Sequence, residues 1–287
     1  MGNGTWTTSS YSAYTTSSRG LSADEFAVSN DFTAQTMYTA RRLASELNPK
    51  NVMRECCDSD EHPYTLPVIL ALDVTGSMGG AAMKVAQKLN EIMTNLYEDE
   101  SIKDIEFCVM GIGDLAYDDA PVQISQFESD IRIAEQLDKV YFEAGGGGNK
   151  YESYSAAWYM GLRHCSLDCW NRGQKGIIIT MGDELPNPYL PKERIASITG
   201  DKVQDDIETT ELLKEVKEKY DVYHIAVNDS ETSYKMYQSW YDEDSKWREL
   251  LGANYCVATL NDLATVIVNI IKDRETSTVN LENEVTW

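Results

Sequence analysis

The fold of this chain is decided by the stretch Val68-Ile69-Leu70-Ala71-Leu72-Asp73-Val74-Thr75-Gly76-Ser77-Met78-Gly79. Its first five residues form a continuous apolar run, which is typical of a strand that is buried on both faces of a parallel sheet. One carboxylate and two hydroxyls follow at alternate positions, on Asp73, Thr75 and Ser77. Because alternate side chains of an extended segment point the same way, this oxygen-only set favours binding of a hard cation such as Mg²⁺.

On either side of this stretch, apolar runs and helical patterns alternate along the chain. Strands are predicted over residues 68–72, 105–112, 122–127, 140–142, 176–181, 222–227 and 255–258. Helices are predicted over residues 79–97, 131–137, 152–164, 209–220, 234–251 and 261–271, and residues 186–201 are predicted to be a long proline-containing loop. This alternation predicts an α/β fold with a mostly parallel central sheet of about six strands, flanked by helices on both faces.

Composition divides the chain into four predicted parts. Residues 1–35 are rich in Ser, Thr, Gly and Tyr without a clear period, so we expect an extended or flexible N-terminal arm, with aromatic residues such as Trp6 as docking anchors. Residues 36–66 are expected to form a helix and a linker that lead into the domain. The α/β domain is predicted over residues 67–273, and residues 274–287 are expected to be a C-terminal tail.

The charge balance limits the classes of partner. The chain of 287 residues has 47 Asp and Glu against 25 Lys and Arg, which gives a formal net charge of -22. Phosphate-rich partners would be repelled, so we expect binding neither to nucleic acid nor to anionic membranes. No apolar run approaches the ~18 residues of a membrane-spanning helix, and the first twenty residues do not resemble a secretory signal. The six cysteines lack metal-binding spacing, which indicates free thiols and a cytoplasmic protein.

The motif at Asp73 carries a family resemblance. Asp73-x-Thr75-x-Ser77 resembles the D-x-S-x-S signature of the metal-ion-dependent adhesion site in von Willebrand factor A (vWA) domains, with Thr in place of the first Ser. The segment 145–154, which begins with four glycines, resembles the second metal loop of the family, and the segment 180–186 resembles the loop after the fourth strand. The local form D-V-T-G-S-M-G and the segment D-S-D-E-H-P at residues 58–63 are similar to intracellular bacterial and phage-associated members.

This resemblance implies roles for individual residues. Asp73 would reach the cation mainly through water, and Thr75 and Ser77 would coordinate it directly. The second-loop threonine of the family aligns near Gly148, so Asn149, Glu152 or a water molecule would substitute for it. Met181 occupies the position of the fourth-loop aspartate. We therefore expect Asp183 to take that role, with Glu184 as the fallback. The cation would be Mg²⁺, or else Mn²⁺ or Ca²⁺.

The resemblance also implies a vWA/Rossmann-like fold and a binding function without catalysis. One coordination position of the cation would stay open and receive an Asp or Glu from a partner protein, whose charge the cation would neutralise. Intracellular members of the family commonly act as adaptors in multiprotein assemblies, often with ATPases or kinases. We therefore expect a metal-dependent protein-interaction module.

Several alternatives remain open from the sequence alone. The chain could be a structural or assembly protein with a vestigial metal site, or a phosphotransfer enzyme of the haloacid-dehalogenase type, although Thr75 stands where that chemistry needs a second aspartate. Locally, Asp73 and Thr75 could merely cap the following helix. The glycines at residues 145–148 could form a plain turn, and Asp183 and Glu184 could belong to a solvated loop.

Overall fold

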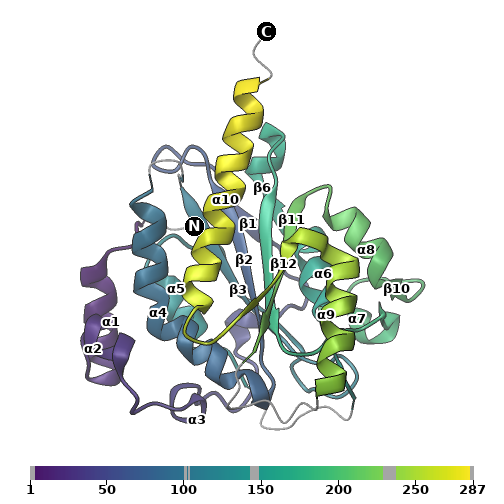
Figure 1. Ribbon diagram of the computed structural model, residues 1–287, viewed down its shortest axis with the longest axis horizontal. Helices are drawn as coiled ribbons and strands as arrows, with labels where there is room; N and C mark the ends of the chain where they lie inside the picture. The colour runs from purple at the N-terminus through teal and green to yellow at the C-terminus, as the bar shows by residue number, and fades with distance from the viewer. Residues whose placement is uncertain (1–3, 100–101, 103, 143–148, 229–236, 285–287) are drawn as a thin grey trace.

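The computed structural model describes residues 4–99, 102, 104–142, 149–228 and 237–284, and its centre is a six-stranded sheet (Figure 1). The strands lie in the order β12-β11-β7-β2-β3-β4. They are β2 (Leu66–Asp73), β3 (Ile105–Ile112), β4 (Val122–Ile124), β7 (Gly176–Gly182), β11 (Tyr220–Val227) and β12 (Tyr255–Ala258). Neighbouring strands are parallel except β3 and β4, which are antiparallel. The predicted fold class, a mostly parallel α/β sheet, is confirmed.

The strand order indicates where a ligand would bind. Counted along the chain, the sheet strands run 3-2-1-4-5-6 from β4 to β12, which is the order of doubly wound folds. The order reverses between β2 and β7, and ligands of such folds bind outside the carboxyl ends of the strands at this point. Asp73, the last residue of β2, therefore lies beside the segment that follows β7.

Helices cover both faces of the sheet (Figure 1). One face carries α4 (Gly79–Tyr97), α5 (Arg132–Leu137) and α10 (Leu263–Glu284), and the other carries α6 (Ser155–Arg163), α7 (Lys192–Thr199), α8 (Thr209–Val216) and α9 (Tyr237–Leu251). Alternate residues of β2 serve the two cores. Leu70 and Leu72 belong to the core with α4, whereas Ile69 and Ala71 belong to the core with α6. The whole of β2 is therefore buried, as its apolar run predicts.

Short strand pairs and 3₁₀ helices lie outside the central sheet. The strand pairs are β1 (Arg54–Cys56) with β6 (Cys165–Leu167), β5 (Tyr151–Glu152) with β8 (Leu185–Pro186), and β9 (Tyr189–Leu190) with β10 (Ile207–Glu208). The 3₁₀ helices are η1 (Ser45–Leu47), η2 (Gly76–Met78), η3 (Asp168–Arg172) and η4 (Gly252–Asn254). The prediction of a loop over residues 186–201 is wrong, because α7 begins after Pro191 and ends at the left-handed Gly200 (φ 86°). Residues 140–142, predicted as a strand, form none.

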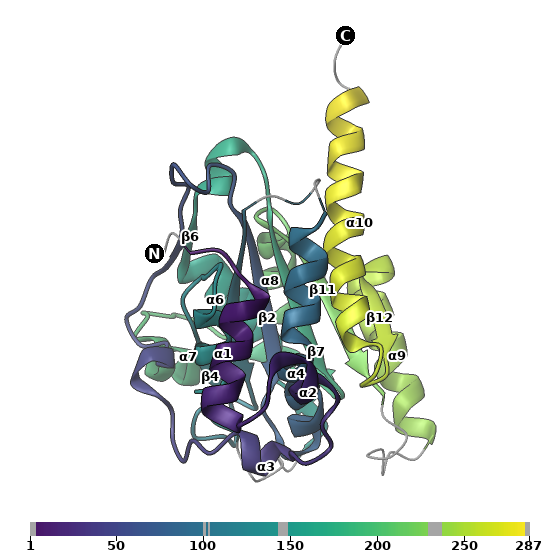
Figure 2. The same cartoon turned by 90° about the vertical axis from the view of Figure 1, so that its left-hand side faces the viewer.

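The N-terminal segment is helical, so the prediction of an extended or flexible arm over residues 1–35 is wrong. It forms α1 (Thr8–Arg19), α2 (Ala23–Val28) and α3 (Ala34–Met37), and α1 and α2 lie along α4 (Figure 2). Trp6 and Tyr11 are docking anchors, but they dock on the chain itself. The indole nitrogen of Trp6 donates to Asn90 Oδ1 at 3.0 Å, and the Tyr11 hydroxyl donates to the Ala86 carbonyl at 2.5 Å. Tertiary burial therefore orders a segment without clear periodicity.

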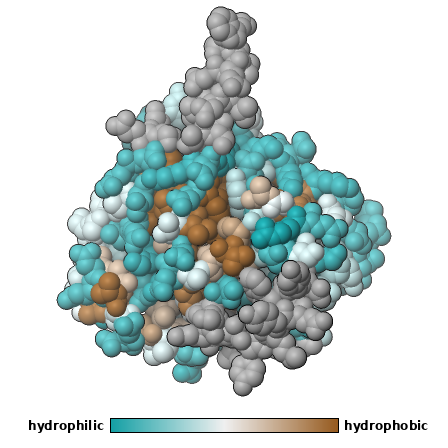
Figure 3. All heavy atoms as spheres, viewed as in Figure 1, coloured by the Kyte–Doolittle hydropathy of each residue, from teal (hydrophilic) through white to brown (hydrophobic). Residues whose placement is uncertain are grey.

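The C-terminal helix is longer than predicted. α10 continues to Glu284, so the prediction of a tail from residue 274 is wrong. Arg274 is only 9% exposed, and its guanidinium donates to Asp221 at 2.9 Å and to the Lys175 carbonyl at 2.5 Å, which fixes this part of α10 beside β11. Apolar surface gathers in the middle of the face that α10 crosses and is surrounded by hydrophilic residues (Figure 3). Among the described helices, none has both the length and the apolar character to cross a membrane.

The docked N-terminal helices make a measurable contribution to stability. Phe26 on α2 is fully buried, so we expect Phe26→Ala to lower the free energy of unfolding by about 3–5 kcal/mol. Val28, two residues away and 75% exposed, provides a matched control whose replacement by Ala changes stability by less than about 0.5 kcal/mol. Urea unfolding measures both. Equal stability of the two variants would contradict the docked arrangement.

Candidate metal centre

The carboxylate of Asp73 is held at the end of β2 by three hydrogen bonds. Oδ1 accepts from the Thr75 backbone nitrogen at 2.9 Å and from the Thr75 hydroxyl at 2.6 Å, and Oδ2 accepts from the Tyr154 hydroxyl at 2.8 Å. The side chain is 1% exposed. Thr75 makes no side-chain capping hydrogen bond to η2, and α4 has no side-chain cap either. Within the described residues, the polar atoms of Thr75 are therefore seen bonded to Asp73 and not to the start of the helix.

Tyr154 connects the loop after β2 to the loop that follows β7. Its hydroxyl, besides donating to Asp73, accepts a hydrogen bond from the Glu184 backbone nitrogen at 3.3 Å. Its buried ring lies edge-on to His224 with 5.0 Å between ring centroids. The hydroxyl also explains Gly182, because a Cβ at that position would lie 1.8 Å from it. Residue 182 is therefore a glycine for a steric reason.

Glu152 brings a second buried carboxylate to the same edge. The parallel pairing of β5 with β8 places Glu152 beside Pro186, on the segment that follows β7. The side chain is 4% exposed, and its Oε2 has no hydrogen-bond partner within the described ranges. Burial, together with the surrounding carboxylates of Asp73, Asp118, Asp114 and Glu184, raises the pKa of Glu152 to about 10. A buried carboxylate with an unpaired oxygen is costly unless positive charge compensates it.

The same excess of negative charge acts on Asp73. Burial and the nearby carboxylate of Asp183 raise the pKa of Asp73 to about 7, although the hydrogen bonds from Thr75 and Tyr154 oppose this rise. Like charges that face one another in a desolvated site favour protonation of one of them. A divalent cation placed among these groups would favour the ionised forms instead.

The structure gathers four of the six predicted site residues at this edge of the sheet: Asp73, Thr75, Glu152 and Asp183. Asn149 has other roles, since its amide donates to Asp114 Oδ2 at 2.7 Å and its carbonyl accepts from the Tyr151 backbone nitrogen at 2.7 Å. The side chain of Ser77 and the glycines at residues 145–148 lie outside the described part of the chain. Glu184, the fallback ligand, lies close enough to raise the pKa of Glu152.

Sequence reasoning missed two acidic residues at the same edge. Asp114 and Asp118 follow β3 and are 1% and 5% exposed. Asp118 Oδ2 accepts from the Asp114 backbone nitrogen at 2.7 Å, and Asp114 Oδ1 accepts from the Ala116 nitrogen at 2.8 Å. The signal for them was their position directly after the second buried strand, where carboxyl ends of parallel strands meet. In the described ranges, no three His, Cys, Asp or Glu side chains already surround a common point as metal ligands would.

The histidines and cysteines lie apart from this centre or have other contacts. His62 pairs with Asp104, and His164 lies between the Val52 carbonyl and Asp201. His224 stacks on Trp247 with 3.6 Å between ring centroids. All six cysteines are free thiols, as predicted. The candidate metal centre therefore consists of oxygen donors.

Comparison with known proteins bears on the fold. No protein-family model and no curated protein matches the sequence. The pilus adhesin SpaC from Lactobacillus rhamnosus GG, in its open conformation, aligns with a TM-score of 0.53 and 14% identity over 79% of this chain and 31% of SpaC. The fold is vWA-like. Proximal thread matrix protein 1 from the mussel byssus, with a zinc-occupied MIDAS motif, aligns with a TM-score of 0.45 and 11% identity over 79% of this chain and 47% of that one. The chain thus spans under a third of SpaC, and the likeness shows the fold alone.

The steric role of Gly182 can be tested by a single methyl group. We expect Gly182→Ala to lower the free energy of unfolding by about 1–3 kcal/mol, because the buried Tyr154 ring cannot move away without losing its hydrogen bonds. Gly80→Ala is the matched control, since its Cβ would meet Leu260 at an ordinary 3.6 Å within a helix. Denaturant unfolding of both variants measures the difference. An unchanged free energy of unfolding for Gly182→Ala would contradict the close packing of Tyr154 against Gly182.

The buried His224 predicts a pH dependence of stability. Complete burial holds the pKa of His224 well below its ordinary value of 6.5. The unfolded chain therefore binds more protons below pH 6.5, so the stability that neutral His224 provides above that pH is lost as the pH falls. We expect the unfolding free energy of the wild type to fall below pH 6.5 by up to about 1.4 kcal/mol per pH unit more steeply than that of His224→Phe. Parallel pH profiles would contradict this.

Proposed function

We propose that this chain is a protein-interaction module in which a divalent cation, held between the loops after β2 and β7, receives a carboxylate from a partner protein. The observation that carries the proposal is the buried Glu152, whose Oε2 lacks a partner within the described residues while Asp73 and Asp183 lie nearby. Such a cluster needs positive charge, and a bound cation supplies it. The vWA-like fold supports the proposal because this edge is where ligands of doubly wound sheets bind.

The donor set fits a hard cation. Asp73, Thr75, Glu152 and Asp183, with Ser77 from the motif, would hold the cation through oxygen atoms, directly or through water, which suits Mg²⁺ and also Mn²⁺ or Ca²⁺. The Thr75 hydroxyl donates a hydrogen bond to Asp73, so that its oxygen lone pairs point elsewhere, as coordination by a hydroxyl requires. Bound there, the cation would polarise and neutralise an incoming carboxylate. We propose Mg²⁺ as the resident ion.

The partner follows from the charge of the chain. At a net charge of -22, the chain repels an acidic surface unless a cation intervenes, so the cation decides whether an acidic partner binds. We propose that the partner is a protein that presents an Asp or Glu, as a component of a cytoplasmic assembly with an ATPase or kinase. Nucleic acids and anionic membranes fit this charge poorly.

Catalysis by phosphotransfer fits the site less well, and we propose that the chain is not an enzyme. An aspartate nucleophile needs an exposed oxygen and a nearby proton donor. Asp73 is 1% exposed, and both of its oxygens accept hydrogen bonds from Thr75 and Tyr154. Thr75 occupies the position that would supply the second carboxyl group.

The proposal predicts stabilisation by divalent cations. We expect millimolar Mg²⁺ or Mn²⁺ to raise the thermal midpoint, with a gain of about 1.4 kcal/mol when the free cation reaches ten times its dissociation constant. Asp73→Asn and Asp183→Asn should abolish this gain, because each removes a charge from the donor set. Asp119→Asn is the matched control, since Asp119 lies exposed near the same edge.

Isothermal calorimetry with MgCl₂ and MnCl₂, after treatment with EDTA, measures the cation directly. Absence of heat and of any thermal shift for the wild type at millimolar cation would overturn the proposal. It would favour the alternative of an assembly protein with a vestigial site.

A further inference from the structure

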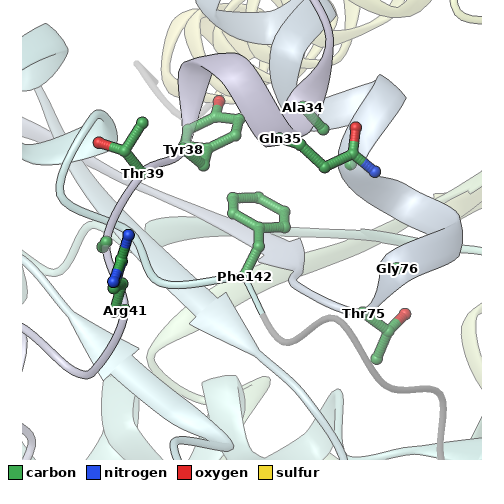
Figure 4. A pocket seen from close by; sticks show the side chains of 10 residues that line it. Ala34, Gln35, Tyr38, Thr39, Arg41, Thr75, Gly76 and Phe142 are labelled. Atoms are coloured by element: carbon green, nitrogen blue, oxygen red, sulfur yellow. The ribbon is translucent and has the colours of Figure 1, made fainter.

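A groove adjoins the candidate metal centre. It has a volume of about 390 Å³, within the range of roughly 300–1,000 Å³ that is typical of ligand sites. The N-terminal segment lines it through Ala34, Gln35, Tyr38 and Arg41, and the loop after β2 at residues 74–79, called the metal loop below, lines its other end at Thr75. The ring of Phe142 lies against Tyr38, between that residue and Thr75 (Figure 4). A molecule bound to a cation at that loop would therefore extend along this groove.

The N-terminal segment and the metal loop are built as one surface. Gly76 and Gly79 of the loop also line the groove, and Ala34 of α3 packs so closely on Gly79 that a Cβ there would lie 2.5 Å from the Ala34 Cβ. This contact fixes α3 at the point where the metal loop enters α4. The segment that the sequence predicts to be a free arm thus contributes a wall to the candidate binding site.

The chemistry of the groove is unusual for this chain. Arg41 is the only charged residue among the described residues that line it, although acidic residues outnumber basic ones 47 to 25 in the sequence. Arg41 is exposed, and within the described ranges its guanidinium forms no hydrogen bond or ion pair. The rings of Tyr38 and Phe142, with centroids 4.3 Å apart, supply apolar surface beside it. The Tyr38 hydroxyl is buried and has no hydrogen-bond partner among the described residues.

We propose that the groove receives an acidic peptide segment of the partner protein that carries two carboxylates with an apolar side chain between them. One carboxylate faces the cation, the apolar side chain lies against Tyr38 and Phe142, and the second carboxylate pairs with Arg41. Charge complementarity of this kind contributes specificity more than affinity. The inference rests on the proposed function and adds to it the sequence pattern that the partner must present.

The experiment uses a displayed library of short peptides with a fixed central Asp and randomised flanks. The library is selected on the full chain in MgCl₂, and the bound peptides are eluted with EDTA. We expect the enriched peptides to share a second Asp or Glu on one side of the fixed Asp, separated from it by an apolar residue. Labelled synthetic copies are then titrated by fluorescence anisotropy.

Charge reversal identifies the partner of the second carboxylate. We expect Arg41→Glu to weaken binding about tenfold, and Arg42→Glu, a neighbouring exposed arginine that does not line the groove, to weaken it less than about twofold. Both variants change the net charge equally, so long-range repulsion cancels in the comparison. Gln35→Trp, at an exposed position that lines the groove, should also weaken binding by occupying the space. Thermal melting checks that each variant is folded.

The outcomes separate the two proposals. If no peptide is retained in MgCl₂ and released by EDTA, the proposed function fails. If peptides are retained through the cation but show no second acidic position, or if Arg41→Glu binds them as well as Arg42→Glu does, the groove inference is overturned while the proposed function stands. A tenfold loss of peptide affinity in Arg41→Glu, without such a loss in Arg42→Glu, supports both proposals.

Discussion

The hydrogen bond from the Tyr154 hydroxyl to Asp73 is the contact on which the arrangement of the candidate site depends. It joins the end of β2 to the segment before α6, and the same hydroxyl fixes the loop after β7 through the Glu184 backbone. Three loops therefore meet at one buried oxygen. Because that oxygen fills the space next to Gly182, the backbone after β7 must pass close to it, and this brings Asp183 toward Asp73.

Burial makes the negative charge at this contact energetically costly. An exposed carboxylate would be solvated, but Asp73 and Glu152 are both almost fully buried among other acids, and the pKa of each is raised. The fold thus concentrates negative charge that the packing itself does not neutralise. A hydrophobic core of two layers around β2 supplies the stability that tolerates such a cluster, as many functional sites require.

Sequence reasoning succeeded where periodicity is strong and failed where tertiary contacts decide. The buried strands at β2, β3 and β7 were predicted within a few residues, because a short continuous apolar run between turn-forming residues is typical of a strand buried on both faces. The helix α1 was missed because polar Ser and Thr dominate it, and α2 because it is only six residues long; both are ordered by burial of aromatics such as Tyr11 and Phe26. At the site, Asp73 and Asp183 followed from the motif. The linking Tyr154 and the acids after β3 did not, because only the folded sheet brings them together.

The groove beside the metal loop would allow the chain to discriminate among acidic partner proteins. A cation alone accepts any accessible carboxylate, so a module that relied on it would discriminate poorly among acidic proteins. In the proposed complex, Arg41 would add a second electrostatic requirement at a fixed place, and Tyr38 and Phe142 would add an apolar requirement between the two charged points. The strongly negative remainder of the chain repels acidic surfaces that lack this pattern. Selectivity would then come from combining repulsion everywhere with attraction at two points, and the N-terminal segment supplies the second of them.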